Sequence, residues 1–281
     1  MTTAAMNITA ADVNKLRQQT GAGMMDCKKA LTEANGDFEK AIDILREKGQ
    51  KVAANRSDRD AKEGVVLAKV TADGKKGILV VLNCETDFVA RNEEFIKLVD
   101  TIGNIALNGN FTTVDELKAA TYADGLSIEK KITEYVGKIG EKMELRFERI
   151  DAEKVFTYNH PGNKLASIVG FNKANANNLA EVGKEISMQI AAMAPIAVDK
   201  SDVTQETLDR ELAVAKEQAR QEGKPEEMLD KIALGKVNKF YKEATLLNQD
   251  FIKDGKKTVQ QYIQDNDKEL KVTGFKRIVL G

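Results

Sequence analysis

The sequence predicts an α+β protein in which a small helical domain precedes two similar segments that mix strands and helices. Three observations predict this class: short helical patterns fill residues 1–49, a charged aperiodic stretch covers 50–63, and two strand hairpins follow. Each hairpin precedes helices and a later strand, in the order β-β-α-α-β. A chain of 281 residues can hold two or three domains. We expect an N-terminal domain at 1–49, a linker at 50–63, and core subdomains at 64–150 and 151–281.

The first 49 residues have the start and stop signals of three short helices. Thr9 is a suitable N-cap for the first helix, and Gly21 follows as its stop. A second helix is expected over about 25–34. Asp37 then caps a third helix, whose apolar residues recur at helical spacing, and we expect Gly49 to end it.

The first core subdomain begins with two strands joined by a turn and continues into a connection that leads to a helix. That helix has one apolar face, and Asn92 is suited to cap it. A second helix and a strand of alternating polarity complete the subdomain. The expected elements are strands 64–70 and 77–82, a helix from Asn92, a helix at about 127–138, and a strand at 143–148.

The second core subdomain repeats this order with an insertion. The expected elements are strands 154–158 and 165–171, helices 178–193 and 258–263, and a last strand at 270–278. Between its helices, at about 203–246, two helical patterns are separated by a break at 222–225. We expect an inserted antiparallel helical hairpin (coiled coil), serving either as a solvated structural arm or as a contact surface.

The composition excludes several classes of function. The 43 basic and 44 acidic residues nearly cancel, which argues against a protein that binds nucleic acid through its charge. No apolar run approaches the roughly 20 residues of a membrane span, and the N-terminus lacks the basic and apolar regions of a signal peptide. The cysteines, Cys27 and Cys84, make no disulfide framework, which favours the reducing cytoplasm.

Few residues suited to catalysis are present. His160 is the only histidine, which excludes histidine-rich zinc sites and leaves little for a Ser-His-Asp site. The phosphate-binding patterns Gly-x-x-x-x-Gly-Lys-Ser/Thr and Gly-x-Gly-x-x-Gly do not occur. We therefore expect neither an enzyme nor a protein with its own cofactor or metal.

The connection at residues 83–91 is the main candidate for a functional site. It joins a buried strand to a helix, and such connections lie at the surface. Thr86 and Asp87 suit that position, whereas Phe88 and Val89 do not. Two interpretations stay open: Phe88 folds back onto its own core, as most loop aromatics do, or it is presented to a partner as an apolar wedge.

Two segments resemble the translation elongation factor Ts family. One is residues 86–90, which read TDFVA; the other is residues 16–37, which contain the run TGAGMMDCKKAL. The resemblance extends over nearly the whole chain. It implies that the N-terminal three-helix domain has the ubiquitin-associated (UBA-like) fold.

The resemblance implies a guanine-nucleotide exchange factor of elongation factor Tu. Such a factor binds elongation factor Tu carrying GDP, disturbs the magnesium and phosphate site of that partner, and promotes replacement of GDP by GTP. By this resemblance Thr86, Asp87, Phe88 and Val89 bind the partner and displace its magnesium ion.

Further partner contacts are implied for Met24, Met25 and His160. From the residues alone, two methionines at a helix start fill a core as readily as they form an adaptable contact, and a lone histidine in a turn is usually a solvated side chain. The chain departs from the family at Ala166 and Ser167, where a Gly-Val pair is usual, so the neighbouring hairpin can pack differently.

The expected partner is elongation factor Tu, through protein–protein contacts in the cytoplasm, as a dimer or a heterotetramer. A different class of function, a scaffold that binds helices or ubiquitin-like partners, also fits a helical domain with a helical arm. The two classes differ in one measurable property, because an exchange factor accelerates GDP release and a scaffold does not.

Overall fold

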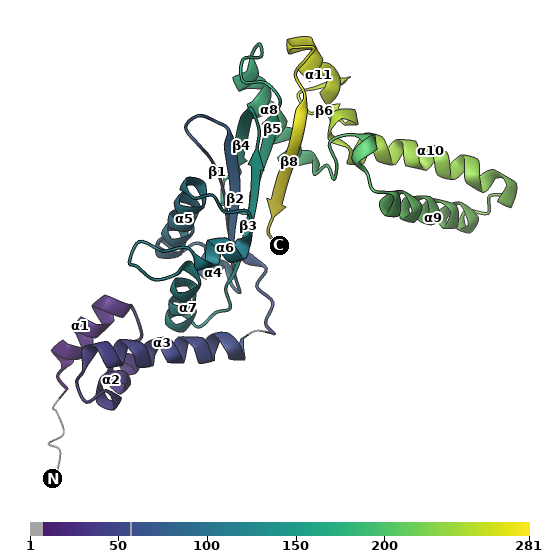
Figure 1. Ribbon diagram of the computed structural model, residues 1–281. Coiled ribbons are helices and arrows are strands. Elements are labelled where there is room, and N and C mark those ends of the chain that lie inside the picture. Colours follow the sequence, from purple (N-terminus) through teal and green to yellow (C-terminus); the bar gives the residue numbers. More distant parts are fainter. Residues whose placement is uncertain (1–7, 57) are drawn as a thin grey trace, which may run out of the picture. The chain divides into compact units, whose positions relative to one another are not determined.

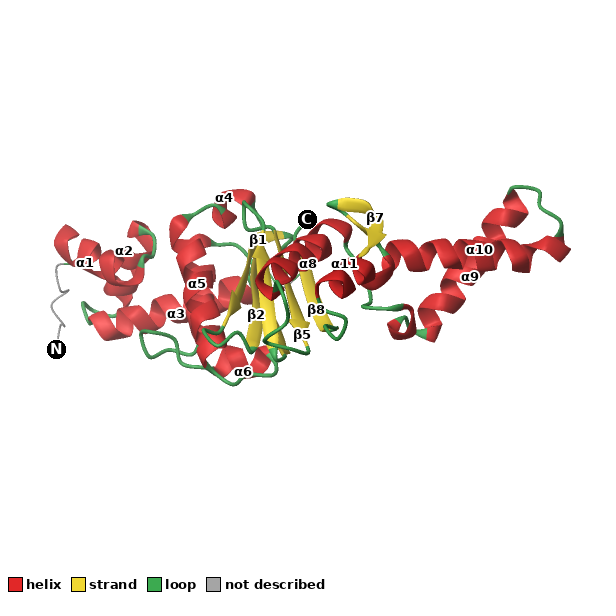
Figure 2. Ribbon diagram, turned by 90° about the horizontal axis from the view of Figure 1, so that it is seen from above, coloured by secondary structure: helices red, strands yellow, loops and turns green. Residues whose placement is uncertain are grey.

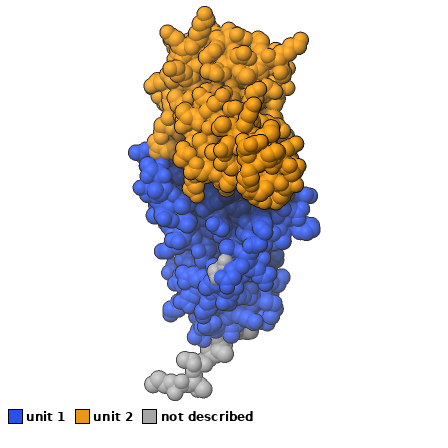
Figure 3. All heavy atoms as spheres, turned by 90° about the vertical axis from the view of Figure 1, so that its right-hand side faces the viewer, with its two compact units in different colours: residues 1–67, 80–148, 280–281 blue, residues 68–79, 149–279 orange. Residues whose placement is uncertain are grey.

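The computed structural model describes residues 8–56 and 58–281. The chain divides into two compact units, which Figure 3 shows in different colours. The first unit holds residues 1–67, 80–148 and 280–281, and the second holds 68–79 and 149–279. Mixed helices and small sheets confirm the predicted α+β class.

The first unit begins with three helices around a small core. They are α1 (Ala10–Thr20), α2 (Met24–Glu33) and α3 (Phe38–Asn55). Thr9 caps α1 as predicted, and Gly21 ends it with a φ of 66°, in the left-handed region that favours glycine. Asp37 caps α3 as predicted. The buried core residues are Val13, Leu16, Cys27, Ala30, Leu31, Ala34 and Ala41.

Helix α3 corrects one prediction, because Gly49 does not end it. The helix continues to Asn55, and Gly49 lies buried against Gly137 of α7 (Ile128–Ile139). A Cβ atom at position 49 would lie 2.9 Å from the carbonyl oxygen of Thr133, and one at position 137 would lie 2.8 Å from the Gly49 Cα. Glycine is present here because two helix backbones approach closely. The local sequence does not distinguish such a glycine from one that ends a helix.

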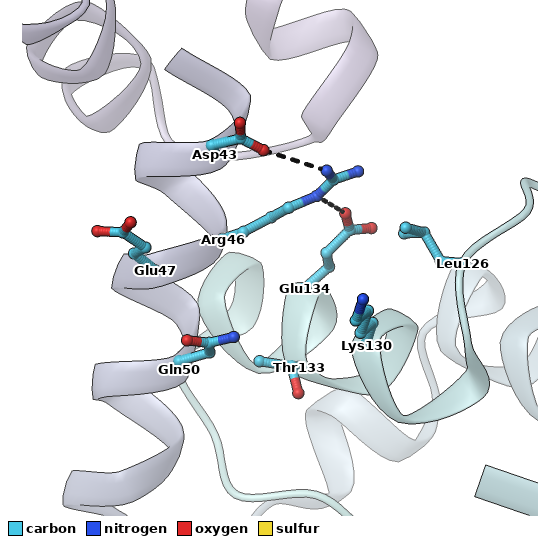
Figure 4. A pocket seen from close by; sticks show the side chains of 8 residues that line it. All are labelled: Asp43, Arg46, Glu47, Gln50, Leu126, Lys130, Thr133 and Glu134. Atoms are coloured by element: carbon cyan, nitrogen blue, oxygen red, sulfur yellow. Dashed lines mark hydrogen bonds and ion pairs between the residues drawn. The ribbon is translucent and has the colours of Figure 1, made fainter. Parts of the chain in front are cut away.

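Polar contacts flank the α3–α7 crossing. The Arg46 Nε donates to Glu134 Oε1 at 2.9 Å, and Arg46 also pairs with Asp43, as Figure 4 shows. These contacts raise the pKa of the Arg46 guanidinium, mainly through the hydrogen bond to Glu134. The pocket drawn there is lined by Leu126 and by charged and polar side chains, and two of its carboxylates, those of Asp43 and Glu134, pair with Arg46.

A three-stranded sheet follows, with strand order β1-β2-β3. Its central strand is buried almost throughout, as its apolar sequence predicts. Helix α5 is capped by Asn92 and buries the predicted face, including Phe95. The elements are β1 (Glu63–Val70), β2 (Lys76–Cys84), α4 (Asp87–Ala90), α5 (Glu93–Asn108), α6 (Val114–Ala119) and β3 (Glu144–Asp151).

The second unit contains an antiparallel sheet of order β4-β5-β8. The strands are β4 (Lys154–Asn159), β5 (Leu165–Phe171) and β8 (Val272–Val279), and the helices that pack with them are α8 (Leu179–Met193) and α11 (Val259–Asn266). The β4–β5 register pairs Tyr158 with Ser167, which places His160 in the connecting turn. The main buried side chains are Val169, Phe171, Leu179, Val182, Ile186, Ile190, Leu246, Phe251, Val259, Ile263, Leu270 and Val272.

The predicted helical hairpin is present between these elements. Helices α9 (Gln205–Gln221) and α10 (Glu226–Ala244) lie side by side and extend away from the sheet of their unit (Figures 1 and 2). Small side chains bring them together, since Ala215, Ala219 and Ala233 are buried between them. Short helices η1 (Lys200–Asp202) and η2 (Leu246–Asn248) flank the hairpin.

Besides η1 and η2, four short elements in the described part of the chain were not predicted from the sequence. They are α4, α6, β6 (Asp250–Phe251) and β7 (Asp254–Thr258). Elements of two to six residues are too short for a hydrophobic period to identify. Within residues 8–56 and 58–281, no helix combines the length and apolarity that crossing a membrane requires.

We expect alanine to have opposite effects on stability at two helical glycines, one at the α3–α7 crossing and one outside it. Gly49→Ala places a methyl group against backbone, and we expect it to lower the free energy of unfolding by about 1–3 kcal/mol. Gly235→Ala in α10 is the matched control, because no atom lies within 4 Å of the added methyl. This control should gain about 1 kcal/mol of helix propensity. Urea unfolding of both variants checks the prediction, and equal stability of the two would contradict it.

Candidate functional site

Residues 83–91 form a tight connection built around the one-turn helix α4. Thr86 has an extended backbone (φ −122°, ψ 154°), and its Oγ1 accepts a hydrogen bond from the Val89 N–H at 3.4 Å. This is an N-cap, the local signal that could have revealed the turn in the sequence. The Arg91 N–H donates to the Asp87 carbonyl, and Asn92 then begins α5.

Phe88 projects from this turn into solvent. Its exposed fraction is 84%, the highest among the large apolar residues exposed in the described part of the chain. Thr86, Asp87 and Val89 are half-buried, and Ala90 is buried beneath the turn. The interpretation in which Phe88 folds onto its own core therefore does not hold. An aromatic ring in water forgoes on the order of 2 kcal/mol of burial, which a partner could supply.

Asp87 lies beside the exposed ring on the same turn. Its Oδ2 is 3.1 Å from Arg91 Nη2, a surface pair four residues apart in which the Arg91 side chain is 78% exposed and the Asp87 side chain 38% exposed. Exposed pairs of this kind contribute little to stability. The Asp87 carboxylate therefore remains available for another polar group.

The carboxylate of Glu141 holds the start of the turn. Its Oε2 accepts hydrogen bonds from the Glu85 N–H at 3.1 Å and the Thr86 N–H at 3.0 Å, and its Oε1 accepts from the Thr86 hydroxyl at 2.7 Å. Glu141 follows Gly140, which ends α7 with a φ of 80°. Three donors on two consecutive residues thus converge on one side chain, 55 residues away in sequence.

The carboxylate of Glu85 makes the reverse connection. Its Oε1 accepts from the Lys142 N–H at 2.7 Å and from Arg56 Nη1 at 2.9 Å, and Arg59 lies 3.8 Å from Oε2. The Lys142 N–H is the main cause that lowers the pKa of Glu85, with the Arg56 hydrogen bond also contributing. The two turns, 85–86 and 141–142, therefore exchange hydrogen bonds in both directions.

Cys84 closes the buried side of the connection. Its Sγ donates to the Thr86 carbonyl at 3.2 Å, and the residue is fully buried. Burial, assisted by the negative charge of Glu141, raises the pKa of this thiol to about 12. Cys84 is therefore a packed thiol rather than a nucleophile.

The other predicted site residues are also exposed. Met24 and Met25 begin α2 with exposed fractions of 54% and 64%, so they do not fill the helical core. His160 is exposed in the β4–β5 turn, where its Nδ1 lies 2.8 Å from the Tyr158 hydroxyl. One turn of the chain brings together Thr86, Asp87, Phe88 and Val89. The start of α2 carries Met24 and Met25, and the second unit carries His160.

Sequence reasoning missed the residues that hold the connection, namely Glu141, Glu85 and Arg56. Their types are common on any charged surface, and nothing local indicates that positions 56, 85 and 141 meet. Among the residues that the structure describes, no group of three or more His, Cys, Asp or Glu residues could hold a metal ion.

The lowered pKa of Glu85 predicts a pH-dependent contribution to stability. A carboxyl group with a lower pKa in the folded state stabilises the protein above its unfolded pKa, which is about 4.3 for glutamate. That stabilisation is lost as the pH falls through the lower folded-state pKa. The unfolding free energy of the wild type should therefore exceed that of Glu85→Gln at pH 7, with a difference that shrinks below about pH 4.3. Urea unfolding across this range checks it, and a difference that does not vary with pH would contradict it.

Comparison with known proteins places these features in one family. A family model described as "Elongation factor TS" matches residues 85–281. A protein named Elongation factor Ts from Christiangramia forsetii is 51% identical over 275 residues, covering 98% of this chain and 99% of the relative. Proteins of the same name from Amoebophilus asiaticus (51% identical; 98% and 100% covered) and Clostridium perfringens (44%; 98% and 93%) also match over nearly their full length. The turn that presents Phe88 and the fold around it are therefore those of a chain that belongs to the elongation factor Ts family.

Proposed function

We propose that this protein is a guanine-nucleotide exchange factor in translation elongation that acts on elongation factor Tu carrying GDP. Membership of the elongation factor Ts family supports the role. The observation that carries the proposal is the exposure of Phe88. Its aromatic ring is 84% exposed, on a turn that is held by hydrogen bonds to Glu141. The protein promotes GDP release and does no covalent chemistry.

The mechanism is a reciprocal linkage between two ligands of one partner. If the exchange factor binds the nucleotide-free partner more tightly than the GDP-bound one, it weakens GDP binding by the same factor by which GDP weakens its own binding. GTP then displaces the exchange factor. A protein with no reactive site can therefore accelerate exchange, because its differential affinity alone performs the work.

Phe88 acts as the wedge in this proposal. Its ring enters an apolar gap in the nucleotide-binding domain of elongation factor Tu and shifts a helix there, which disturbs the magnesium and phosphate site. Asp87 supplies the adjacent polar contact. Thr86 and Val89 set the geometry of the turn through their cap hydrogen bond. A rigid anchor loses little conformational entropy on binding, so the turn is preorganised for insertion.

Further contacts of the proposed complex lie outside this turn. Met24 and Met25 offer an adaptable apolar surface on the N-terminal helices, because methionine side chains are flexible and polarizable. His160 offers a contact from the second unit. Contacts from both units would hold the partner while Phe88 acts.

We further propose a domain division for this complex. The division assigns a UBA-like domain to residues 1–49 and β-β-α-α-β subdomains to 64–150 and 151–281, with a linker at 50–63. The three N-terminal helices and the two three-stranded sheets support this division, and the first part of the linker, to Asn55, continues helix α3.

Truncation of Phe88 tests the proposed function directly. We expect Phe88→Ala to slow stimulated GDP release from elongation factor Tu by roughly tenfold or more, because about 2 kcal/mol of anchor burial is lost. The melting temperature should change little, since the ring is exposed. Phe95→Ala is the matched control: this ring is fully buried in α5, so its loss should lower the melting temperature clearly. A Phe88→Ala variant that melts early and still stimulates exchange normally would contradict the proposal.

Substitution of His160 tests the second contact region. We expect His160→Ala to weaken the complex by about 1 kcal/mol, the effect of a residue at the edge of an interface, and to leave the fold intact. Tyr158→Phe removes only the hydroxyl that lies beside the imidazole and separates direct contact from positioning. Titration calorimetry measures the affinity of both variants for elongation factor Tu. Unchanged affinity of His160→Ala would show that His160 is a solvated turn residue and not a partner contact.

A further inference from the structure

We infer that Glu141 is a positioning residue for Phe88: its carboxylate fixes the turn from which the ring projects. The inference rests on the proposed exchange function for its readout in activity, but its structural basis is independent. Glu141 accepts three hydrogen bonds, all from Glu85 and Thr86, directly before the turn begins.

The turn needs an external support because α4 has only four residues. A single helical turn fixes several backbone angles for one or two hydrogen bonds and is unstable by itself. Of the residues in α4, only Ala90 is buried. Packing beneath the turn is therefore slight, and the orientation of Phe88 depends on how residues 85 and 86 are held.

The Thr86 hydroxyl links Glu141 to α4. A hydroxyl has one hydrogen to donate, and here that hydrogen goes to Glu141 Oε1 at 2.7 Å. The oxygen lone pairs are then free to accept from the Val89 N–H, which closes the cap. A carboxylate can only accept hydrogen bonds, so it forces the hydroxyl into this direction. An amide at position 141 could donate to the hydroxyl instead, which would leave the direction of the hydroxyl hydrogen unfixed.

Glu141 is itself placed by a rigid part of the first unit. It follows the end of α7, and that helix is held against α3 by the contact of Gly49 with Gly137. A further ion pair joins Lys138 of α7 to Glu94 at the start of α5. The turn that carries Phe88 is thus held both by α7, through Glu141, and by β2, the strand that precedes it.

The experiment compares Glu141→Gln and Glu141→Ala with a control, Glu144→Gln. Glu144 is an exposed residue at the start of β3, three positions along the chain. Stimulated GDP release from elongation factor Tu is measured against exchange-factor concentration. We expect the maximal rate to fall roughly threefold for Glu141→Gln and roughly tenfold for Glu141→Ala, as charged hydrogen bonds are weakened or lost. The half-saturating concentration should change less, because the remaining contact regions are untouched.

A double-mutant cycle separates positioning from a general structural role. If Glu141 acts through Phe88, then Glu141→Gln should have no further effect on the maximal rate once Phe88 is alanine. Effects that simply multiply would overturn the inference. A maximal rate for Glu141→Gln equal to that of Glu144→Gln would also overturn it.

Amide hydrogen exchange keeps the inference testable if the proposed function fails. A wild-type protein that does not accelerate GDP release would refute the function and leave the turn to be examined in the free protein. In the free protein, Glu141→Gln should raise the hydrogen-exchange rate of the Val89 and Ala90 amides. The Ile102 amide in the buried part of α5 should keep its hydrogen-exchange rate. Unchanged rates at Val89 and Ala90, or an equal rise at Ile102, would show that Glu141 does not position the turn.

Discussion

The exchange of hydrogen bonds between two turns, 85–86 and 141–142, is the constraint on which the candidate site depends. Each turn places a carboxylate where the other offers backbone N–H groups, so that Glu141 holds Glu85 and Thr86 while Glu85 holds Lys142. Hydrogen bonds to a charged acceptor are stronger than neutral ones. Two such connections in opposite directions resist rotation of either turn better than one would.

A second constraint supports the first at the level of helices. Glycines at 49 and 137 let α3 and α7 approach until their backbones touch, and Arg46 with Glu134 fixes the register beside that contact. The arginines at 56 and 59 that follow α3 then reach Glu85. The N-terminal helices are therefore connected to the turn bearing Phe88 both through α7 and through these side chains.

The sequence predicts the local features well and the tertiary ones poorly, for a physical reason. Caps at Thr9, Asp37 and Asn92 and the stop at Gly21 depend on neighbouring residues only, and all four are confirmed. The predicted helix end at Gly49 is wrong, because a glycine needed for close packing has the same local sequence context as one that ends a helix. The exposure of Phe88 stayed open because it depends on which surface lies beneath the turn. Glu141 was missed because its contact spans 55 residues of chain.

Burial of both cysteines has a practical consequence for labelling chemistry. Cys27 and Cys84 are fully buried, and burial raises the pKa of the Cys84 thiol to about 12. Maleimide reagents attack thiolates that solvent can reach, so neither native thiol should compete for the dye at neutral pH. A single cysteine introduced at an exposed place, such as Leu234 on the helical hairpin, would then carry the only fluorophore. The native background thus permits distance measurements across an assembled complex without first removing any cysteine.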